Sequence, residues 1–246
     1  MKKIITGFFM SWGMFCTIPC PNKVWDDESR SFSVVFLPVI GLIIGIIWAV
    51  IAFLLHLISC PAILTAALLT VIPYLLSGFM HLDGFMDCCD AMLSRRTLEE
   101  RQRILKDSHT GAFAVICLCI LMLITFSLFA STKTTFSVWS LIFIPAAARI
   151  PSAICVLCLT PMSTSQYAKA EHPKMCRIAA YALLVIICVL DALIFGVHGI
   201  GAAAAVISGF AAVLYARGNL GGMSGDISGF GITIAECIGI AFTVLI

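Results

Sequence analysis

Three aspartates, Asp83, Asp87 and Asp90, lie within eight residues of one another in the stretch HLDGFMDCCDAM at 81–92. A helix turns by about 100° per residue, so the spacing i, i+4 and i+7 places the three carboxylates on one helical face. Carboxylates crowded in this way repel one another unless they take up protons or share a cation. Oxygen ligands of this kind suit Mg²⁺ or Mn²⁺, so the pattern predicts a divalent-metal site.

The rise of a helix limits how these aspartates can share an ion. At about 1.5 Å per residue, Asp83 and Asp90 are roughly 10 Å apart along the axis. A single ion cannot reach all three carboxylates of a straight helix. Either two ions bind, or one ion takes ligands from elsewhere in the chain, and Asp107 and Asp226 are the candidates for those ligands.

Basic and glycine-rich segments near the aspartates favour a phosphate-bearing substrate, because a metal ion and cationic side chains together offset the charge of phosphate oxygens. The expected helix start at 108–111 and the glycine-rich turn before Asp226 can both approach an anion closely. His81 is a possible metal ligand, but hard divalent metals prefer oxygen, so a structural histidine or a phosphate contact is at least as good an interpretation. Arginines also have a simpler explanation, since positive residues keep a loop on the cytoplasmic side. The remaining candidate contacts are Arg95, Arg96, Lys106, Ser108, His109, Gly222 and Ser224.

The composition is typical of a membrane protein. Of the 246 residues, 61% are hydrophobic and 11% are charged, far from the charged quarter expected of a soluble domain. The net charge of +2 excludes an extended nucleic-acid surface, so the lipid bilayer is the expected partner. The twelve cysteines lie mostly in apolar runs, where they act as small hydrophobic residues of helices.

Windows of about twenty apolar residues predict an all-α fold, a polytopic bundle of about seven membrane spans that forms a single domain over residues 1–246. A shorter apolar segment, 4–18, is predicted to be a re-entrant or interfacial helix, with a true crossing as the alternative. The predicted spans are 32–58, 61–80, 111–131, 136–159, 178–195, 199–215 and 230–246.

The basic residues predict which loops face the cytoplasm. If segment 4–18 does not cross, thirteen of the fifteen Lys and Arg residues fall in inner segments, while Lys133 lies outside and Arg149 lies within a span. The three polar stretches that carry the candidate residues then share the cytoplasmic side, so we expect them to meet in one site. The chain is therefore predicted to be integral to the inner (cytoplasmic) membrane of a prokaryote, with its site facing the cytoplasm.

Two features within the predicted spans concern packing. Arg149 lies in the middle of a span, where an ionisable side chain needs a partner, and Glu236 in the last span is a candidate for that partner. The stretch GLIIG at 41–45 has the spacing of two glycines that lets helices approach closely. We therefore expect tight helix packing along that span.

The ordered set of motifs resembles the cobalamin synthase family, also called adenosylcobinamide-GDP ribazoletransferase. The likeness rests on HLDGFMDCCDAM, SRRTLEERQRILKDSHTGAFAV at 94–115 and LGGMSGDISG at 220–229, and it spans nearly the whole chain. The resemblance implies a late step of cobalamin synthesis, in which a ribose hydroxyl of α-ribazole or its 5′-phosphate attacks adenosylcobinamide-GDP. GMP leaves, adenosylcobalamin or its 5′-phosphate forms, and Mg²⁺ is required.

By matching position, the resemblance makes Asp83, Asp87 and Asp90 metal ligands and catalytic residues, with Asp226 as a further ligand. Asp107 would orient the attacking hydroxyl or a water molecule. The implied partners are the two small-molecule substrates and the bilayer, and a homo-oligomer is compatible with the sequence. Two alternatives are a lipid enzyme like the CDP-alcohol phosphotransferases, whose fuller motif is not present here, and a transporter, whose polar residues would lie nearer the membrane midplane.

Overall fold

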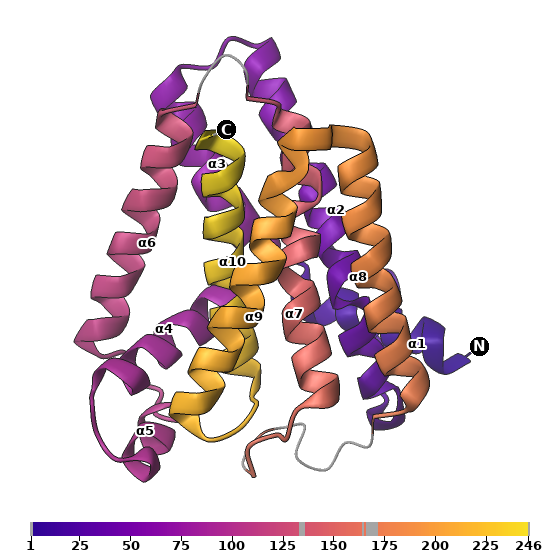
Figure 1. Cartoon of the computed structure of the whole chain (residues 1–246), viewed down its shortest axis with the longest axis vertical. Helices are drawn as coiled ribbons and strands as arrows, with labels where there is room; N and C mark the ends of the chain where they lie inside the picture. Colours follow the sequence, from indigo (N-terminus) through magenta and orange to yellow (C-terminus); the bar gives the residue numbers. More distant parts are fainter. Residues whose placement is uncertain (1, 133–135, 164, 166–171, 246) are drawn as a thin grey trace.

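The computed structural model is a bundle of helices (Figure 1). It describes residues 2–132, 136–163, 165 and 172–245, without the side chains of residues 197 and 198, so Lys133 lies outside the described residues. Three 3-10 helices, η1 (Asp27–Ser29), η2 (Val138–Ile142) and η3 (Gly196–Gly199), precede longer helices. The α-helices are α1 (Lys2–Phe15), α2 (Arg30–Leu57), α3 (Ala62–Leu76), α4 (Met80–Leu93), α5 (Leu98–Ile104), α6 (Ala112–Ala130), α7 (Ile144–Cys158), α8 (Lys174–Phe195), α9 (Ile200–Leu220) and α10 (Gly225–Leu245).

Six segments of the described chain are long and apolar enough to cross a membrane, or seven if the bent pair α3–α4 counts as one crossing. The six are α2 with η1, α6, α7 with η2, α8, α9 and α10. This finding confirms the polytopic helical bundle. Helix α1 packs against α2 but has only 14 residues, about 21 Å in length, which is shorter than a bilayer core of about 30 Å.

The predicted span 61–80 does not continue as one straight helix. Helix α3 has 15 residues, about 23 Å, and ends at Leu76. Gly78 and Phe79 then adopt positive φ angles of 65° and 61°, and α4 leaves at 94° to α3. The apolar run continues through this turn, so hydropathy alone does not mark the bend. As a result, α4 lies across one end of the bundle (Figure 1).

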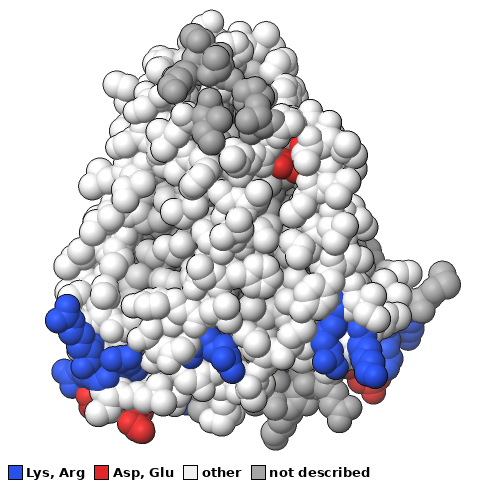
Figure 2. Space-filling view, in the orientation of Figure 1, with Lys and Arg blue, Asp and Glu red and all other residues white. Residues whose placement is uncertain are grey.

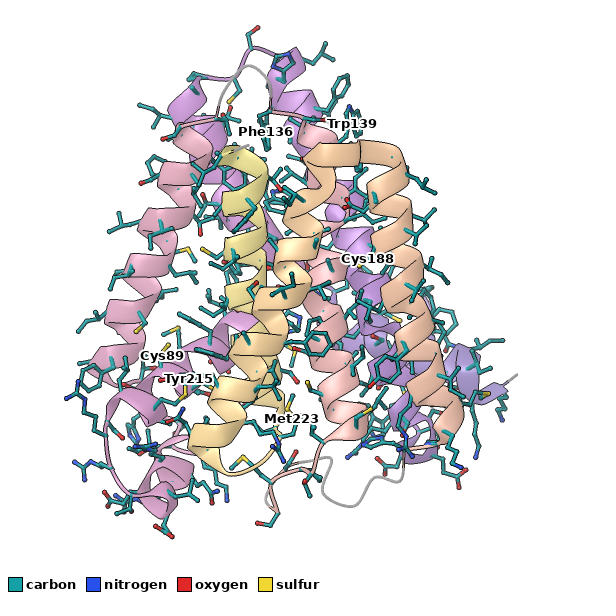
Figure 3. The ribbon with its side chains drawn as sticks, viewed as in Figure 1. Cys89, Phe136, Trp139, Cys188, Tyr215 and Met223 are labelled. Carbon is teal, nitrogen blue, oxygen red and sulfur yellow. The ribbon has the colours of Figure 1, made fainter. Side chains whose placement is uncertain are left out.

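The polar segments of the chain gather at that same end. Helices α4 and α5 lie there beside the turn between α9 and α10, and the C-terminus lies at the opposite end (Figure 1). The visible Lys and Arg side chains form a band at this end, as the distribution of charge in the sequence predicts (Figure 2). Met223 and Cys89 lie in this half of the molecule, whereas Phe136 and Trp139 lie near the other end (Figure 3).

Helix α7 is buried along nearly its whole length and forms the centre of the bundle. It packs against α2, α9 and α10. The contact of α2 with α7 and with the preceding η2 depends on the two glycines of GLIIG. A Cβ atom at Gly41 would meet the carbonyl of Pro145 in α7, and one at Gly45 would meet the carbonyl of Ile142 in η2. The close packing expected from the glycine spacing is confirmed.

A buried ion pair joins two neighbouring helices of the bundle. Arg149 of α7 donates from Nη1 to Glu236 Oε1 of α10 at 2.6 Å and to the carbonyl of Pro145 at 2.8 Å. Both charged side chains are buried, so each charge depends on the other for its stability. The partner expected for Arg149 is confirmed, and the pair ties α7 to the helix that begins with Asp226.

Replacing one partner of this pair should therefore be more harmful than replacing both. We expect Arg149→Met to lower the free energy of unfolding by about 3–5 kcal/mol, because Glu236 is left as an unpaired buried charge. The double variant Arg149→Met/Glu236→Leu should recover a large part of that loss. Unfolding in detergent solution, followed by circular dichroism, measures both, and a single variant as stable as the unaltered protein would contradict the pairing.

Candidate functional site

Helices α4 and α10 cross with their backbones in contact, and two glycines permit this approach. A Cβ atom at Gly84 would lie 2.8 Å from both the Cα and the carbonyl oxygen of Asp226, and one at Gly229 would lie 2.8 Å from the carbonyl oxygen of His81. Thr233 donates a hydrogen bond to that same carbonyl at 3.1 Å. The crossing brings the start of α10 directly beside the aspartates of α4.

The crossing gathers four carboxylates into one electrostatic environment. The negative charges of Asp83, Asp226 and Asp90 all act on Asp87, and Asp83 also acts on Asp226. Asp83 is exposed, whereas Asp87, Asp90 and Asp226 are half-buried. The expectation that polar stretches far apart in the sequence meet in one place is thus confirmed for 81–90 and 221–226.

The carboxylates do not form a closed cage for a metal ion. Within the described residues, no three His, Cys, Asp or Glu side chains are placed so that they could hold one ion. Their chemistry is nevertheless that of a hard-metal site, because only carboxylate oxygens are offered. Such a set can contribute one or two ligands to an ion that takes its others from water and from phosphate.

Asp90 has a structural task that the sequence did not reveal. Its carboxylate accepts hydrogen bonds from the backbone amides of Gly111 and, at 3.2 Å, Ala114. These amides belong to the first turn of α6, whose N-cap is Gly111, a residue without a side chain that could cap the helix. The anion expected at this helix start is therefore Asp90 itself, and a further role of Asp90 as metal ligand stays a prediction.

If Asp90 caps α6, its removal should destabilise the protein in a way that removal of Asp87 does not. We expect Asp90→Ala to lower the free energy of unfolding by about 1 kcal/mol, the usual effect of losing an N-cap acceptor. Asp87→Ala removes an equal charge from the same helix and serves as the control. Thermal unfolding compares the two variants, and equal midpoints would contradict the capping role.

The turn from 221 to 224 is held by backbone contacts rather than by its glycines alone. Met162 donates from its amide to the carbonyl of Met223 at 2.9 Å, and Met223 donates to the carbonyl of Thr160 at 3.0 Å. A Cβ atom at Gly222 would collide with Met162, so this glycine packs against the chain that follows α7. The predicted substrate contact of Gly222 stays a prediction beside this packing role.

Ser224 begins α10 and also touches the candidate carboxylate. Its hydroxyl oxygen accepts a hydrogen bond from the amide of Ile227, as an N-cap residue does, and its hydroxyl can donate to Asp226 Oδ2, both at 3.3 Å. The start of α10 also carries partial positive charge. The local sequence Ser-Gly-Asp therefore fixes the direction of the Asp226 side chain.

Helix α5 supports this end of the site. Gln102 donates to the carbonyl of Leu220 at 2.8 Å, and Arg101 contacts the backbone and side-chain oxygens of Asn219. Arg95 and Arg96 lie exposed just before α5, where Arg96 pairs with Glu100. These two arginines do not line either of the two cavities that Asp226 borders. Their substrate contacts stay predictions.

The loop between α5 and α6 brings one cation to the site. Lys106 lines a cavity beside Asp226, whereas Asp107 and His109 pair with each other at 2.6 Å in the exposed loop that also contains Ser108. The hydrogen bond and charge of Asp107 raise the pKa of His109, so the imidazole keeps its positive charge to higher pH and loses it as the pH rises through that raised value. The catalytic role predicted for Asp107 is not tested by this arrangement.

Two cavities meet at Gly225 and Asp226. The first, of about 290 Å³, has a mixed polar and apolar lining, which consists of Leu105, Lys106, Met162, Ser165, Ser224, Gly225 and Asp226. The second, of about 160 Å³, lies between α1, α2, α4, α7 and α10 and includes His81, Asp83 and Asp226. Asp226 therefore borders two separate spaces, which is the arrangement needed to bring two ligands to one carboxylate.

Sequence reasoning missed the apolar residues that shape these cavities. Met14 and Phe15 of α1 line the second cavity, and Met162 lines the first. Nothing in their residue types distinguishes them from other apolar residues of the chain, so no local signal could have identified them. The sequence shows Gly84 among the aspartates, but only the structure shows that it contacts α10.

Since Gly84 faces backbone atoms that cannot move aside, a side chain there should push α4 and α10 apart. We expect Gly84→Ala to lower the free energy of unfolding by about 1–3 kcal/mol, as overpacking does. Gly218→Ala is the matched control, because a Cβ atom there would meet nothing within 4 Å. Chemical unfolding in mixed micelles measures both variants, and equal stability would show that the helices are not in close contact.

Comparison with known proteins gives one consistent result. A family model described as cobalamin-5-phosphate synthase matches residues 7–244, which include every candidate site residue. The chain is 36% identical over 245 residues to the adenosylcobinamide-GDP ribazoletransferase of Clostridium perfringens (strain SM101 / Type A), with 98% of each chain covered. It is 35% identical to the protein of that name from Clostridium botulinum (strain Alaska E43 / Type E3), with 98% of this chain and 97% of the relative covered. No solved structure matches.

Proposed function

Because this chain belongs to the cobalamin-5-phosphate synthase family, we propose that it is an adenosylcobinamide-GDP ribazoletransferase that carries out a late step of cobalamin synthesis. It joins α-ribazole, or its 5′-phosphate, to adenosylcobinamide-GDP and releases GMP. The observation that carries this proposal at the site is the position of Asp226, which borders two cavities and lies beside the acidic face of α4. A reaction between two bound substrates needs such a boundary.

The acidic cluster suits a Mg²⁺ ion that is shared with the pyrophosphate of the donor substrate. One or two of the carboxylates of Asp83, Asp87 and Asp226 would hold the ion, and the ion would offset the charge that develops on phosphate during displacement. The open arrangement of the carboxylates agrees with the usual coordination of Mg²⁺, which keeps water and takes phosphate oxygens as ligands. Without a cation, these mutually repelling carboxylates would also repel the phosphates of the substrate.

The residues around the ion have separate tasks in this proposal. Lys106 lines the first cavity and neutralises charge on the phosphates of adenosylcobinamide-GDP. The ribose hydroxyl of the acceptor attacks the cobinamide-side phosphorus from the second cavity, and the bond to GMP breaks. The proton of this hydroxyl passes to the carboxylate of Asp226, which borders both cavities, and GMP leaves with the electron pair of the broken P–O bond. Ser224 holds the Asp226 side chain in place through its hydroxyl.

We further propose that the site faces the cytoplasm from the inner membrane. The Lys and Arg residues gather at the end of the bundle that carries the site, and positive residues are retained on the cytoplasmic side of bacterial membranes (Figure 2). The substrates carry charged, water-soluble groups, so they could reach a site on the cytoplasmic side from the water phase. The same position near one end of the bundle, away from the midplane, argues against a transporter.

The first test of the proposed chemistry is the variant Asp87→Asn. We expect it to reduce Mg²⁺-dependent release of GMP from adenosylcobinamide-GDP and α-ribazole by roughly a hundredfold or more, because an amide replaces a charged oxygen ligand. GMP is measured by chromatography with purified protein. Glu99→Gln, which removes an equal charge from the exposed face of α5, is the control and should keep full activity.

Undiminished turnover by Asp87→Asn would reject the assignment of the metal to this cluster. A transporter would give a different pattern, because it would move substrate into sealed vesicles without producing GMP. An enzyme that acts on CDP-activated lipids would release CMP from them and would not use adenosylcobinamide-GDP.

A further inference from the structure

Helix α1 and the segment that follows it, 17–25, form a groove of about 530 Å³, the α1 groove. The large apolar side chains of its lining are Phe9, Met10, Met14, Ile18, Val24 and Trp25. Hydrogen bonds hold the chain beside it in place. The amide of Thr17 donates to the carbonyl of Leu76 at 2.9 Å, and Trp12 Nε1 donates to the carbonyl of Ile18 at 2.9 Å. The α1 groove is therefore a preformed apolar surface, which is the usual character of a ligand site.

One residue of this lining carries a charge. Lys23 is exposed, and within the described part of the chain it forms no ion pair. Nearby charges are paired with one another. Lys3 contacts Glu28 at 2.6 Å, and Arg30 contacts Asp27 at the same distance. Lys23 is thus a cation without a counter-ion beside an apolar surface.

The α1 groove lies at a level of the molecule that suits a membrane surface. The N-terminal end of α1 projects from the side of the bundle, in the half that carries the band of Lys and Arg side chains (Figures 1 and 2). A helix of 14 residues that is too short to cross the bilayer suits its interface. Trp25 is 56% exposed, and tryptophan is enriched where lipid headgroups meet the acyl chains.

These observations define the chemistry of the ligand. The apolar lining requires a hydrocarbon part, and the unpaired Lys23 requires a negatively charged group next to it. A phospholipid with a net negative headgroup supplies both parts at this level of the molecule. A zwitterionic lipid also carries an ammonium group, which Lys23 would repel. The remaining acid of the neighbouring segment, Asp26, accepts a hydrogen bond from Ser29 and does not line the groove.

We propose that the α1 groove binds an anionic phospholipid such as phosphatidylglycerol, with an acyl chain against the apolar lining and the phosphate beside Lys23. This binding site is separate from the carboxylates of α4 and α10, and it does not depend on the proposed reaction. Met14 lines both the α1 groove and the second cavity at Asp226. The bound lipid therefore contacts a side chain that shapes the candidate site.

The headgroup assignment can be tested by native mass spectrometry of the full chain in detergent micelles, which counts the lipids bound to each protein. We expect dioctanoyl phosphatidylglycerol to bind about fivefold more tightly than dioctanoyl phosphatidylcholine, the effect of one lysine near a membrane surface. Lys23→Gln should reduce this preference to less than about twofold. Lys174→Gln, at an exposed lysine that begins α8 and does not line the groove, is the matched control and should keep the preference.

The apolar lining can be tested by filling the groove. Gly13 belongs to the lining, and a Cβ atom there would meet its nearest neighbour, Cys20, only at 4.0 Å, so a larger side chain can enter the space. We expect Gly13→Leu to weaken the binding of both dioctanoyl lipids by about fivefold or more, because the leucine displaces part of the acyl chain. Gly218→Leu is the matched control, since a Cβ atom there would meet nothing within 4 Å.

Equal binding of the two lipids by the unaltered protein would overturn the proposal, as would an equal loss of preference in Lys23→Gln and Lys174→Gln. Undiminished lipid binding by Gly13→Leu would count against the groove. Glycerol 1-phosphate, which has no acyl chain, should not bind, and binding as tight as that of phosphatidylglycerol would reject the role of the apolar lining. A protein dimer that carries no lipid and is lost in Gly13→Leu would assign the groove to a second copy of the chain instead. None of these measurements uses GMP release, so a failure of the proposed function would appear separately.

Discussion

The close crossing of α4 over α10 determines how near the acidic side chains of the site can come to one another. Gly84 and Gly229 leave no side chain between the two backbones, and Phe85 stacks on Phe230 with ring centroids 5.7 Å apart. Asp226 lies in the first turn of α10, directly against Gly84, which follows Asp83 in the chain. A packing feature therefore sets the strength of the charge repulsion among these carboxylates.

The bend between α3 and α4 decides where this crossing occurs. Phe79 adopts a left-handed backbone conformation that costs an ordinary L-residue on the order of 1–2 kcal/mol, and its amide bonds the carbonyl of Tyr74. Had α3 continued straight, the aspartates would have extended away from the bundle instead of turning onto α10. Packing of α4 against α10 and α6 holds the bend in place.

Much of the architecture could be predicted from the sequence because burial in a bilayer demands long apolar helices. The spans that became α2, α6, α7, α8, α9 and α10 are strong signals of this kind. The pairing of Arg149 with Glu236 also followed, since a charge within a span needs a partner. The bend at Phe79 could not be predicted, because the residues of the bend are as apolar as the helices around them. Tertiary packing causes this bend.

The site was predicted less completely, for a physical reason. A cluster of carboxylates in a sequence indicates that cations or hydrogen-bond donors must lie nearby. The positions in the sequence do not show whether a given carboxylate binds a cation or accepts hydrogen bonds. Asp90 illustrates this, because the helical spacing grouped it with the metal ligands although its carboxylate accepts amides of α6. The apolar cavity next to His81 was equally hidden, since its lining comes from separate helices that only the fold brings together.

The capping role of Asp90 also bears on the number of ions. Sequence geometry left two alternatives, either two ions along α4 or one ion that takes a ligand from elsewhere. The Asp90 carboxylate is directed to the amides of Gly111 and Ala114, whereas Asp83 and Asp87, one helical turn apart, and Asp226 across the helix crossing act on one another electrostatically. For the cation that we propose at this cluster, the arrangement favours the second alternative, because α10 supplies a carboxylate that a straight helix cannot.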